Sequence, residues 1–260
     1  MAAPLLITGG TGTLGRLAVP LLRDAGCHVR VLSRHRHEST DGVEFVTGDL
    51  ATGDGLDAAV DGVETILHCA GSSKGDEEKA RSLVRAASRS GVRHLVYISV
   101  VGAERIPVVS GVDRALFGYF AAKRAAENVI AESGVPWTTL RATQFHDLIL
   151  TVARQLAKLP VLPVPSDRFQ PVDAAEVAAR LVELALGAPS GLVPDLGGPR
   201  VYELSDLVRG YLRAPRKRRL IMPIRLPGGA ARAVRAGALR TPVPAGGTRT
   251  WEEFLAERLG

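Results

Sequence analysis

Two side chains near the middle of the chain have types and a spacing that could move a proton. Tyr119 and Lys123 lie four residues apart in a stretch predicted to be helical, so both project from one face of that helix. A lysine ammonium close to a phenol favours the phenolate and so lowers the pKa of the phenol. The pair could donate a proton to a carbonyl that receives hydride, or accept one in the reverse direction. The alternative is a tyrosine that packs in the core or contacts a cofactor.

A glycine-rich turn close to the N-terminus has the context of a nucleotide-binding loop. An apolar run, Leu5–Thr8, is followed by Gly9-Gly10-Thr11-Gly12-Thr13-Leu14-Gly15 and then by apolar residues at helical spacing. Gly9 would make the tight turn, Gly12 would admit a diphosphate, and Gly15 would let the helix pack on the strand. The N–H groups and positive dipole end of the helix would face the phosphates. The alternative is a purely structural turn.

The end of the second predicted strand bears on which nicotinamide nucleotide would bind. A protein that prefers NAD places a carboxylate there, to accept hydrogen bonds from the ribose 2′-hydroxyl. This chain has Ser33 and Arg34 instead, and a guanidinium binds a 2′-phosphate through charge-assisted hydrogen bonds. The sequence therefore favours NADP(H) over NAD(H). The alternative is a solvated Arg34, with Glu38 or Asp41 folded back to the ribose.

Strands and helices alternate along the first half of the chain. Apolar runs of strand length occur at 5–8, 28–33, 43–47, 65–69, 95–99 and 137–140, and most are separated by a helical pattern. This order predicts an α/β fold, a Rossmann-type doubly wound parallel sheet with helices on both faces. The carboxyl ends of its strands would form one ligand-binding edge.

The regular alternation weakens beyond Arg141. Helices are predicted at 145–156, 173–186, 202–212 and 251–259, whereas the proline-bounded stretch 160–165 cannot be helical. We expect residues 1–150 to form the nucleotide-binding core. Residues 151–260 would form a small substrate-side subdomain that completes the same domain.

Composition excludes several classes of protein. The 260 residues suffice for one large α/β domain, and no apolar stretch approaches the roughly 18 residues of a membrane span. No signal peptide is visible. Cys27 and Cys69 have neither disulfide nor metal-ligand spacing, so no metal site is expected. The expected setting is cytoplasmic, with a small-molecule substrate and no membrane.

The net charge of +6 is unevenly distributed. Residues 200–260 hold 13 Lys/Arg and 5 Asp/Glu, a charge of +8, whereas residues 1–199 hold 20 and 22, a charge of −2. The excess includes the run Arg216–Arg219. Because aromatic interleaving and DNA-binding motifs are absent, we interpret the excess as a solvated basic face and not as a nucleic-acid site. A homo-oligomer or a regulatory protein partner stays open.

Five groups of residues carry a resemblance to a known family. They are Thr8–Gly15, Gly48–Leu50, Tyr119 with Lys123, Leu140–His146 and Gln170–Asp173. In these residues the chain resembles atypical short-chain dehydrogenases/reductases of the NmrA-like branch. The resemblance implies an NAD(P)-binding Rossmann core in which Lys123 reaches the nicotinamide ribose. The cofactor-binding residues expected from the motifs and the resemblance together are Gly9, Thr11, Gly12, Thr13, Leu14, Gly15, Ser33, Arg34, Asp49, Leu50, Ala70, Gly71, Ser99 and Lys123.

One departure from the family pattern concerns its catalytic triad. Family reductases with a full triad carry a serine or threonine shortly after the fifth strand, a position that falls near Val100 or Val101 here; Ser99 lies slightly earlier. Two main functions follow. The first is an NADP-dependent oxidoreductase, with Tyr119 and Lys123 catalytic, that moves hydride to or from a small apolar carbonyl, enone or polycyclic substrate. The second is a non-catalytic NADP(H) sensor that acts through a protein partner. An isomerase, epimerase or dehydratase that uses the cofactor transiently is a third.

Three residues after the sixth predicted strand are candidates to line a substrate pocket. Gln144, Phe145 and His146 fall at the carboxyl edge of the sheet, where substrates meet the cofactor in this fold class. For His146 the alternative is a half-buried histidine with satisfied hydrogen bonds.

Overall fold

The computed structural model describes residues 3–40, 42–71, 75–213, 219–242 and 244–259. The strands are β1 Leu5–Thr8, β2 Val29–Ser33, β3 Val43–Thr47, β4 Thr65–His68, β5 His94–Val100, β6 Trp137–Ala142, β7 Val161–Pro165, β8 Arg168–Phe169, β9 Gly191–Leu192, β10 Tyr202–Glu203 and β11 Leu220–Ile224. The helices are α1 Thr13–Asp24, α2 Leu56–Val60, α3 Asp76–Arg89, α4 Gly111–Ala131, α5 His146–Leu156, α6 Ala174–Leu186, α7 Leu204–Arg213, α8 Gly229–Arg235 and α9 Trp251–Leu259.

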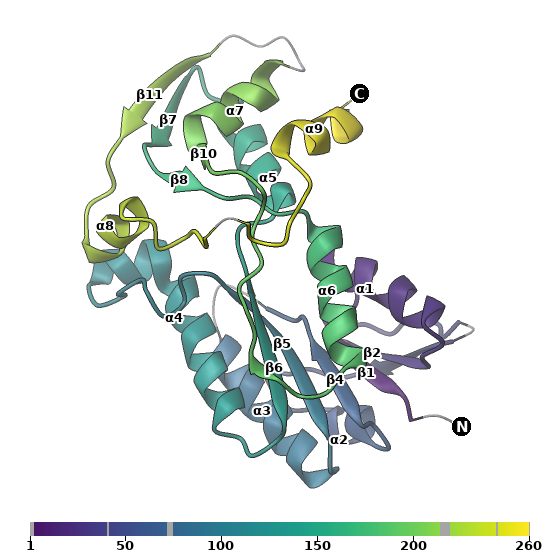
Figure 1. Cartoon of the computed structure of the whole chain (residues 1–260). Helices are drawn as coiled ribbons and strands as arrows, with labels where there is room; N and C mark the ends of the chain where they lie inside the picture. The colour runs from purple at the N-terminus through teal and green to yellow at the C-terminus, as the bar shows by residue number, and fades with distance from the viewer. Residues whose placement is uncertain (1–2, 41, 72–74, 214–218, 243, 260) are drawn as a thin grey trace. The chain divides into compact units, whose positions relative to one another are not determined.

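A seven-stranded parallel sheet in the order β3-β2-β1-β4-β5-β6-β9 forms the centre of the first part of the fold (Figure 1). Its central strands β1, β4 and β5 are short apolar runs buried on both faces, as parallel strands covered by helices must be. The chain runs outward from β1 to β3, then returns to β4 on the other side of β1. This reversal between β1 and β4 is the topological switch point at which doubly wound sheets bind ligands.

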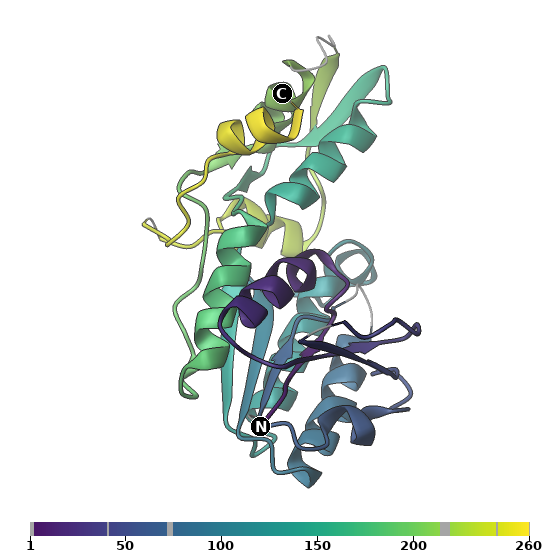
Figure 2. The same cartoon turned by 90° about the vertical axis from the view of Figure 1, so that its right-hand side faces the viewer.

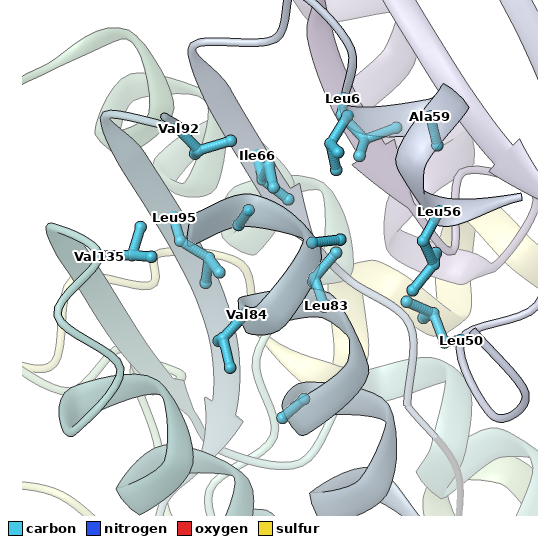
Figure 3. Close-up of a cluster of buried hydrophobic side chains, with 14 of the residues drawn as sticks. Leu6, Leu50, Leu56, Ala59, Ile66, Leu83, Val84, Val92, Leu95 and Val135 are labelled. Atoms are coloured by element: carbon cyan, nitrogen blue, oxygen red, sulfur yellow. The ribbon is translucent and has the colours of Figure 1, made fainter. Parts of the chain in front are cut away.

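Helices cover both faces of this sheet. Figures 1 and 2 show α1 and α6 on one face, and α2, α3 and α4 on the other. On the second face a cluster of buried side chains fills the space between sheet and helices, and Figure 3 shows Leu6, Ile66 and Leu95 from three strands beside Leu83 from α3. The predicted Rossmann-type α/β fold is therefore confirmed.

The chain divides into two compact units that interleave along the sequence. The first unit contains residues 1–99, 121–141 and 175–194, and the second contains residues 100–120, 142–174 and 195–260. Residues 100–120 and 142–150 of the predicted 1–150 core fall in the second unit, whereas residues 175–194 return to the first; the predicted boundary after residue 150 stays a prediction. In the second unit, α5, α7 and α9 enclose a core that includes Trp251 and Phe254.

The structure matches the predicted elements closely in the first unit and adds short ones in the second. The stretch 160–165, which could not be a helix, forms β7 and pairs in parallel with β11. The two-residue strands β8 and β10 pair antiparallel, and α8 follows β11; none of these three was predicted. In the described part of the chain, no helix is long and apolar enough to cross a membrane. Arg216, Lys217 and Arg218 of the basic run lie outside the described residues, as does Asp41.

Candidate functional site

The glycine turn after β1 sits at the switch point of the sheet. Gly9 has a φ of +72°, a left-handed conformation that L side chains rarely adopt. A Cβ on Gly9 would lie 2.7 Å from the backbone nitrogen of Ala70, at the end of β4. Gly9 is therefore required both by its conformation and by the close approach of β4.

Gly12 and Gly15 have different surroundings, which suit different roles. A Cβ on Gly15 would collide with the backbone of Gly9 and Gly10, so this glycine lets the first turn of α1 pack against the loop. Among the described residues, a Cβ on Gly12 would meet only the Gly9 carbonyl oxygen, at 3.2 Å. Thr11, Gly12 and Thr13 are exposed, while Leu14 is buried. The turn is closed on the protein side and open on the solvent side.

The N-terminus of α1 leaves its backbone donors available to a ligand. Gly12 is the N-cap residue, no side chain in the described residues caps the helix, and its first turn contains no acidic residue. Helix N-termini of this kind attract anions through their N–H groups and their dipole. The open turn is thus a suitable cradle for a diphosphate.

The end of β2 carries the residues that were predicted to choose between NADP and NAD. Ser33 is buried, and its hydroxyl accepts a hydrogen bond from the His35 N–H at 3.2 Å. Arg34 is exposed, and within the described residues no hydrogen bond or ion pair holds its guanidinium. Glu38, the alternative ribose ligand, is also exposed.

Asp49 and Leu50, after β3, have local roles in the structure. The Asp49 carboxylate accepts a hydrogen bond from the Ala51 N–H at 2.8 Å, so it closes a turn with one of its oxygens. Leu50 is buried in the core cluster of the first unit. Their contact with a cofactor stays a prediction.

Lys123 lies buried beside the end of β4 and has several partners within the first unit. Its ammonium donates to the Tyr97 hydroxyl and to the Ile98 carbonyl, each at 3.2 Å. The same nitrogen lies 3.3 Å from a carboxylate oxygen of Asp76, the first residue of α3. A Cβ on Gly71 would lie 3.0 Å from the ammonium nitrogen. The lysine charge therefore lies next to the end of β4, the strand whose end Gly9 closely approaches.

The buried groups around Lys123 differ in their charge. Burial, assisted by the Lys123 charge, lowers the pKa of His68 to about 3, so its imidazole is neutral. That ring stacks on Tyr97 and lies 2.6 Å, nitrogen to oxygen, from the Thr8 hydroxyl. Burial raises the pKa of the Cys69 thiol to about 12. For Lys123, burial lowers the pKa and the Asp76 carboxylate opposes this effect.

The residues at and next to the position of the family's triad serine or threonine are buried. Ser99, Val100 and Val101 are all less than 9% exposed. In the first unit, the Arg141 guanidinium binds the Glu127 carboxylate through two hydrogen bonds of 2.8 and 2.7 Å. These bonds lower the pKa of Glu127 against the opposing effect of its burial. No triad serine or threonine occurs at positions 100 and 101.

Tyr119 belongs to the same continuous helix as Lys123 but lies in the second unit. Its side chain is 38% exposed, and its ring contacts Phe120 edge to face. Lys123 lies one helical turn further on and is only 3% exposed. The structure shows a hydrogen bond from Lys123 to the hydroxyl of a different tyrosine, Tyr97. The catalytic role of Tyr119 stays a prediction.

The three candidate substrate residues take part in the packing of the second unit. The Gln144 side chain donates to the Leu239 carbonyl at 3.3 Å and accepts from the Gln170 N–H at 3.4 Å. Phe145 is the N-cap residue of α5. His146 is fully buried, with its ring 4.9 Å from that of Phe254. A substrate contact for these residues stays a prediction.

Sequence reasoning missed two residues that the structure places at Lys123. Tyr97 lies in an apolar run that reads as core strand, and Asp76 begins a charged helix, where an acidic residue is expected for the helix dipole alone. The partner that Asp76 meets in the fold, Lys123, lies on α4, far along the chain. Within the described residues, no group of His, Cys, Asp or Glu could hold a metal ion.

Comparisons with known proteins agree with this nucleotide-binding geometry. A family model described as NAD(P)H-binding matches residues 9–185. The chain is 32% identical over 183 residues to (4-alkanoyl-5-oxo-2,5-dihydrofuran-3-yl)methyl phosphate reductase from Streptomyces griseus, a match that covers 67% of this chain and 61% of that protein. It is 32% identical over 225 residues to ceramide reductase from Caulobacter vibrioides, covering 79% of this chain and 65% of that protein. Less than two thirds of either relative is spanned.

Solved structures show the same fold. An NADPH-dependent quinone oxidoreductase from Escherichia coli, complexed with NADPH, superposes with a TM-score of 0.80 and 20% identity over 98% of this chain and 100% of its own. The triphenylmethane reductase of a Citrobacter species, complexed with NADP(H), superposes with a TM-score of 0.79 and 19% identity over the same shares. At these identities the likeness concerns the fold alone.

Proposed function

Because the chain belongs to the NAD(P)H-binding family, among the atypical short-chain dehydrogenases/reductases, we propose that it is an NADPH-dependent reductase. One observation carries the proposal: an open glycine turn and a buried ammonium flank the adjacent ends of β1 and β4. The turn offers backbone donors to a diphosphate, and the ammonium offers a charge to ribose hydroxyls. Both features belong to one unit of the fold.

Each part of the cofactor has a candidate partner in the first unit. The N–H groups at the start of α1 would hold the diphosphate, and the absence of a Cβ at Gly12 leaves room for it. Arg34 would bind the 2′-phosphate, because its guanidinium is exposed at the end of β2 and no carboxylate stands in its place. Lys123 would hold the nicotinamide ribose. When bound, NADPH supplies a hydride.

The protein's own contribution to the reaction would be to orient the substrate and to supply a proton. Tyr119 is the candidate acid, and the lysine one helical turn away would favour its phenolate. Because positions 100 and 101 are buried valines, a triad hydroxyl would not hold the substrate carbonyl there.

We propose an electron-poor carbonyl, enone or polycyclic compound as the hydride acceptor. The two relatives are reductases of an alkanoyl-oxo-dihydrofuran and of ceramide, and the structural neighbours are a quinone oxidoreductase and a triphenylmethane reductase.

The test is a screen of quinones, enones and triphenylmethane dyes with purified protein and NADPH, followed by the absorbance of the reduced nicotinamide. We expect oxidation of NADPH with at least one of these classes, and little with Tyr119→Phe. Binding of NADPH without turnover in any class would contradict the reductase assignment.

A non-catalytic NADP(H) sensor is the second candidate. The observation that favours it is the pair of buried valines at the position of the triad hydroxyl. A sensor would bind NADPH and NADP+ with different affinities and would bind a protein partner in only one of these states. Tyr119→Phe would leave the partner binding of a sensor unchanged, whereas it would lower the turnover of a reductase.

A further inference from the structure

Asp76 is a buried carboxylate at the candidate ribose site to which no role is assigned above. It is the first residue of α3 and is 2% exposed. One of its oxygens lies 3.3 Å from the Lys123 ammonium, and the other lies 3.6 Å from the ammonium of Lys79, one turn along the helix. A carboxylate that was needed only for the helix dipole would be equally effective at the surface.

The contacts of Lys123 differ in their nature. Tyr97 and Ile98 accept from its ammonium as neutral oxygens at 3.2 Å, whereas Asp76 supplies the opposite charge. A neutral contact can be exchanged for a ligand hydroxyl at low cost, since one neutral hydrogen bond replaces another. Loss of the carboxylate would instead leave a buried ammonium without its counter-charge, which is strongly unfavourable.

Gly71, just after β4, lies directly against this buried ion pair. A Cβ at Gly71 would lie 3.0 Å from the Lys123 nitrogen and 3.4 Å from the Asp76 oxygen that faces it. The space that a side chain would fill therefore borders both members of the pair. Gly71 itself is exposed.

We propose that Asp76 is a positioning residue that holds the Lys123 ammonium in place and charged, so that the pair binds hydroxyl groups of the nicotinamide-side ribose. This inference rests on the proposed function and extends it to a residue that neither the sequence motifs nor the resemblance includes.

The charged and titratable groups around the ion pair come from several elements. Among the described residues, those facing Lys123 are Asp76 and Lys79 on α3, Glu127 on its own helix, His68 and Cys69 at β4, and Tyr97 on β5. The pKa values of about 3 for His68 and about 12 for Cys69 keep both neutral across the working range. Glu127 is paired with Arg141. Removal of the Asp76 carboxylate therefore takes the counter-charge from Lys123 while His68 and Cys69 stay neutral.

Asp76→Asn should make NADPH binding depend on pH. Burial already lowers the pKa of Lys123, and removal of the carboxylate removes the effect that opposes it. The variant should bind NADPH at least about tenfold more weakly, and more weakly still as pH rises from about 6 to 9. The affinity of the unaltered protein should change less over this range, because the Asp76 carboxylate opposes the effect of burial on the pKa of Lys123.

Glu77→Gln is the matched control. Glu77 lies next to Asp76 in the first turn of α3, and its carboxylate pairs with the exposed Arg81 on the surface. Both substitutions remove one negative charge from the same helix end, so an effect of the helix dipole would be equal in the two variants. Only Asp76→Asn should change the pH dependence of binding.

A double-mutant cycle with Lys123→Met tests whether Asp76 acts through Lys123. NADPH titrations by fluorescence and thermal unfolding without nucleotide would be measured for both single variants and the double variant. The double variant should bind as weakly as Lys123→Met and no more weakly. It also lacks an unpaired buried charge, so it should fold even if Asp76→Asn does not.

The outcomes are distinct. Wild-type affinity in Asp76→Asn at every pH, or a double variant weaker than Lys123→Met, would overturn the positioning role while leaving the proposed function intact. A pH dependence in Glu77→Gln equal to that of Asp76→Asn would also overturn it. Absence of NADPH binding by the unaltered protein would remove the proposed function and this inference together.

Discussion

A methyl group at Gly12 should weaken nucleotide binding without disturbing the fold. The residue has φ −82° and ψ −176°, an extended backbone that alanine adopts readily. Among the described residues, its Cβ would touch only the Gly9 carbonyl oxygen, at 3.2 Å. We expect Gly12→Ala to change the free energy of unfolding by less than about 1 kcal/mol.

The loss in binding can be given a magnitude. The methyl group would keep the diphosphate from the N–H groups of the α1 N-terminus. Loss of one hydrogen bond to a charged group costs about 1.5–3 kcal/mol, which corresponds to about a 10- to 150-fold weaker Kd for NADPH.

Gly9→Ala is the matched comparison, because it should do the opposite. A left-handed conformation costs alanine about 1–2 kcal/mol, and the backbone shift needed to relieve the 2.7 Å approach to Ala70 adds about 1–3 kcal/mol. For a chain of this size, a total of about 2–5 kcal/mol lowers Tm by about 4 to 20 °C.

Thermal unfolding without nucleotide and NADPH titration would be measured on the same preparations of both variants. The reasoning is refuted if Gly12→Ala binds NADPH as tightly as the unaltered protein, because the diphosphate would then not approach this turn. It is also refuted if Gly12→Ala is destabilised as much as Gly9→Ala.

Three further outcomes are expected. Tyr119→Phe should lower turnover by about 10²- to 10⁴-fold at unchanged NADPH affinity if Tyr119 is the general acid, and a change below fivefold in a steady-state assay would exclude that role. The pKa of Glu127 is lowered by Arg141, so the pair should stabilise the fold above the ordinary carboxylate pKa of about 4.3 and lose this contribution as pH falls toward the folded-state value. Denaturant unfolding at neutral pH should find Glu127→Gln less stable by about 3–5 kcal/mol, with a smaller acid dependence than the unaltered protein. With its pKa near 12, Cys69 should react with iodoacetamide far more slowly than Cys27 at about pH 8, as peptide mass spectrometry would show.

The fold was predictable because its signals are local. The apolar runs at β1 to β6 and the helical spacing between them appear within short windows, and the glycine turn marks the switch point directly. The two-residue strands β8 and β10 could not be predicted in this way, because their pairing depends on residues brought together by the tertiary fold. The interleaving of the two units has the same cause, since it depends on where β6 and α6 return.

The candidate site was predictable where a motif carries it and not where packing does. Gly9, Gly12 and Gly15 have the surroundings that their spacing indicated. The contact between Asp76 and Lys123 could not be predicted, since the two residues lie on different helices and meet only in the fold. Tyr97 resembles any strand residue until its hydroxyl is seen at 3.2 Å from the lysine ammonium.

The central claim is that the first unit binds NADPH, with Arg34 at the 2′-phosphate. The most direct test is the titration of the purified protein with NADPH and with NADH, followed by the fluorescence of the reduced nicotinamide. The account predicts that NADPH binds at least about tenfold more tightly, a difference of about 1.4 kcal/mol. Equal affinity for the two would contradict the role of Arg34. Absence of binding by either would contradict the whole functional account.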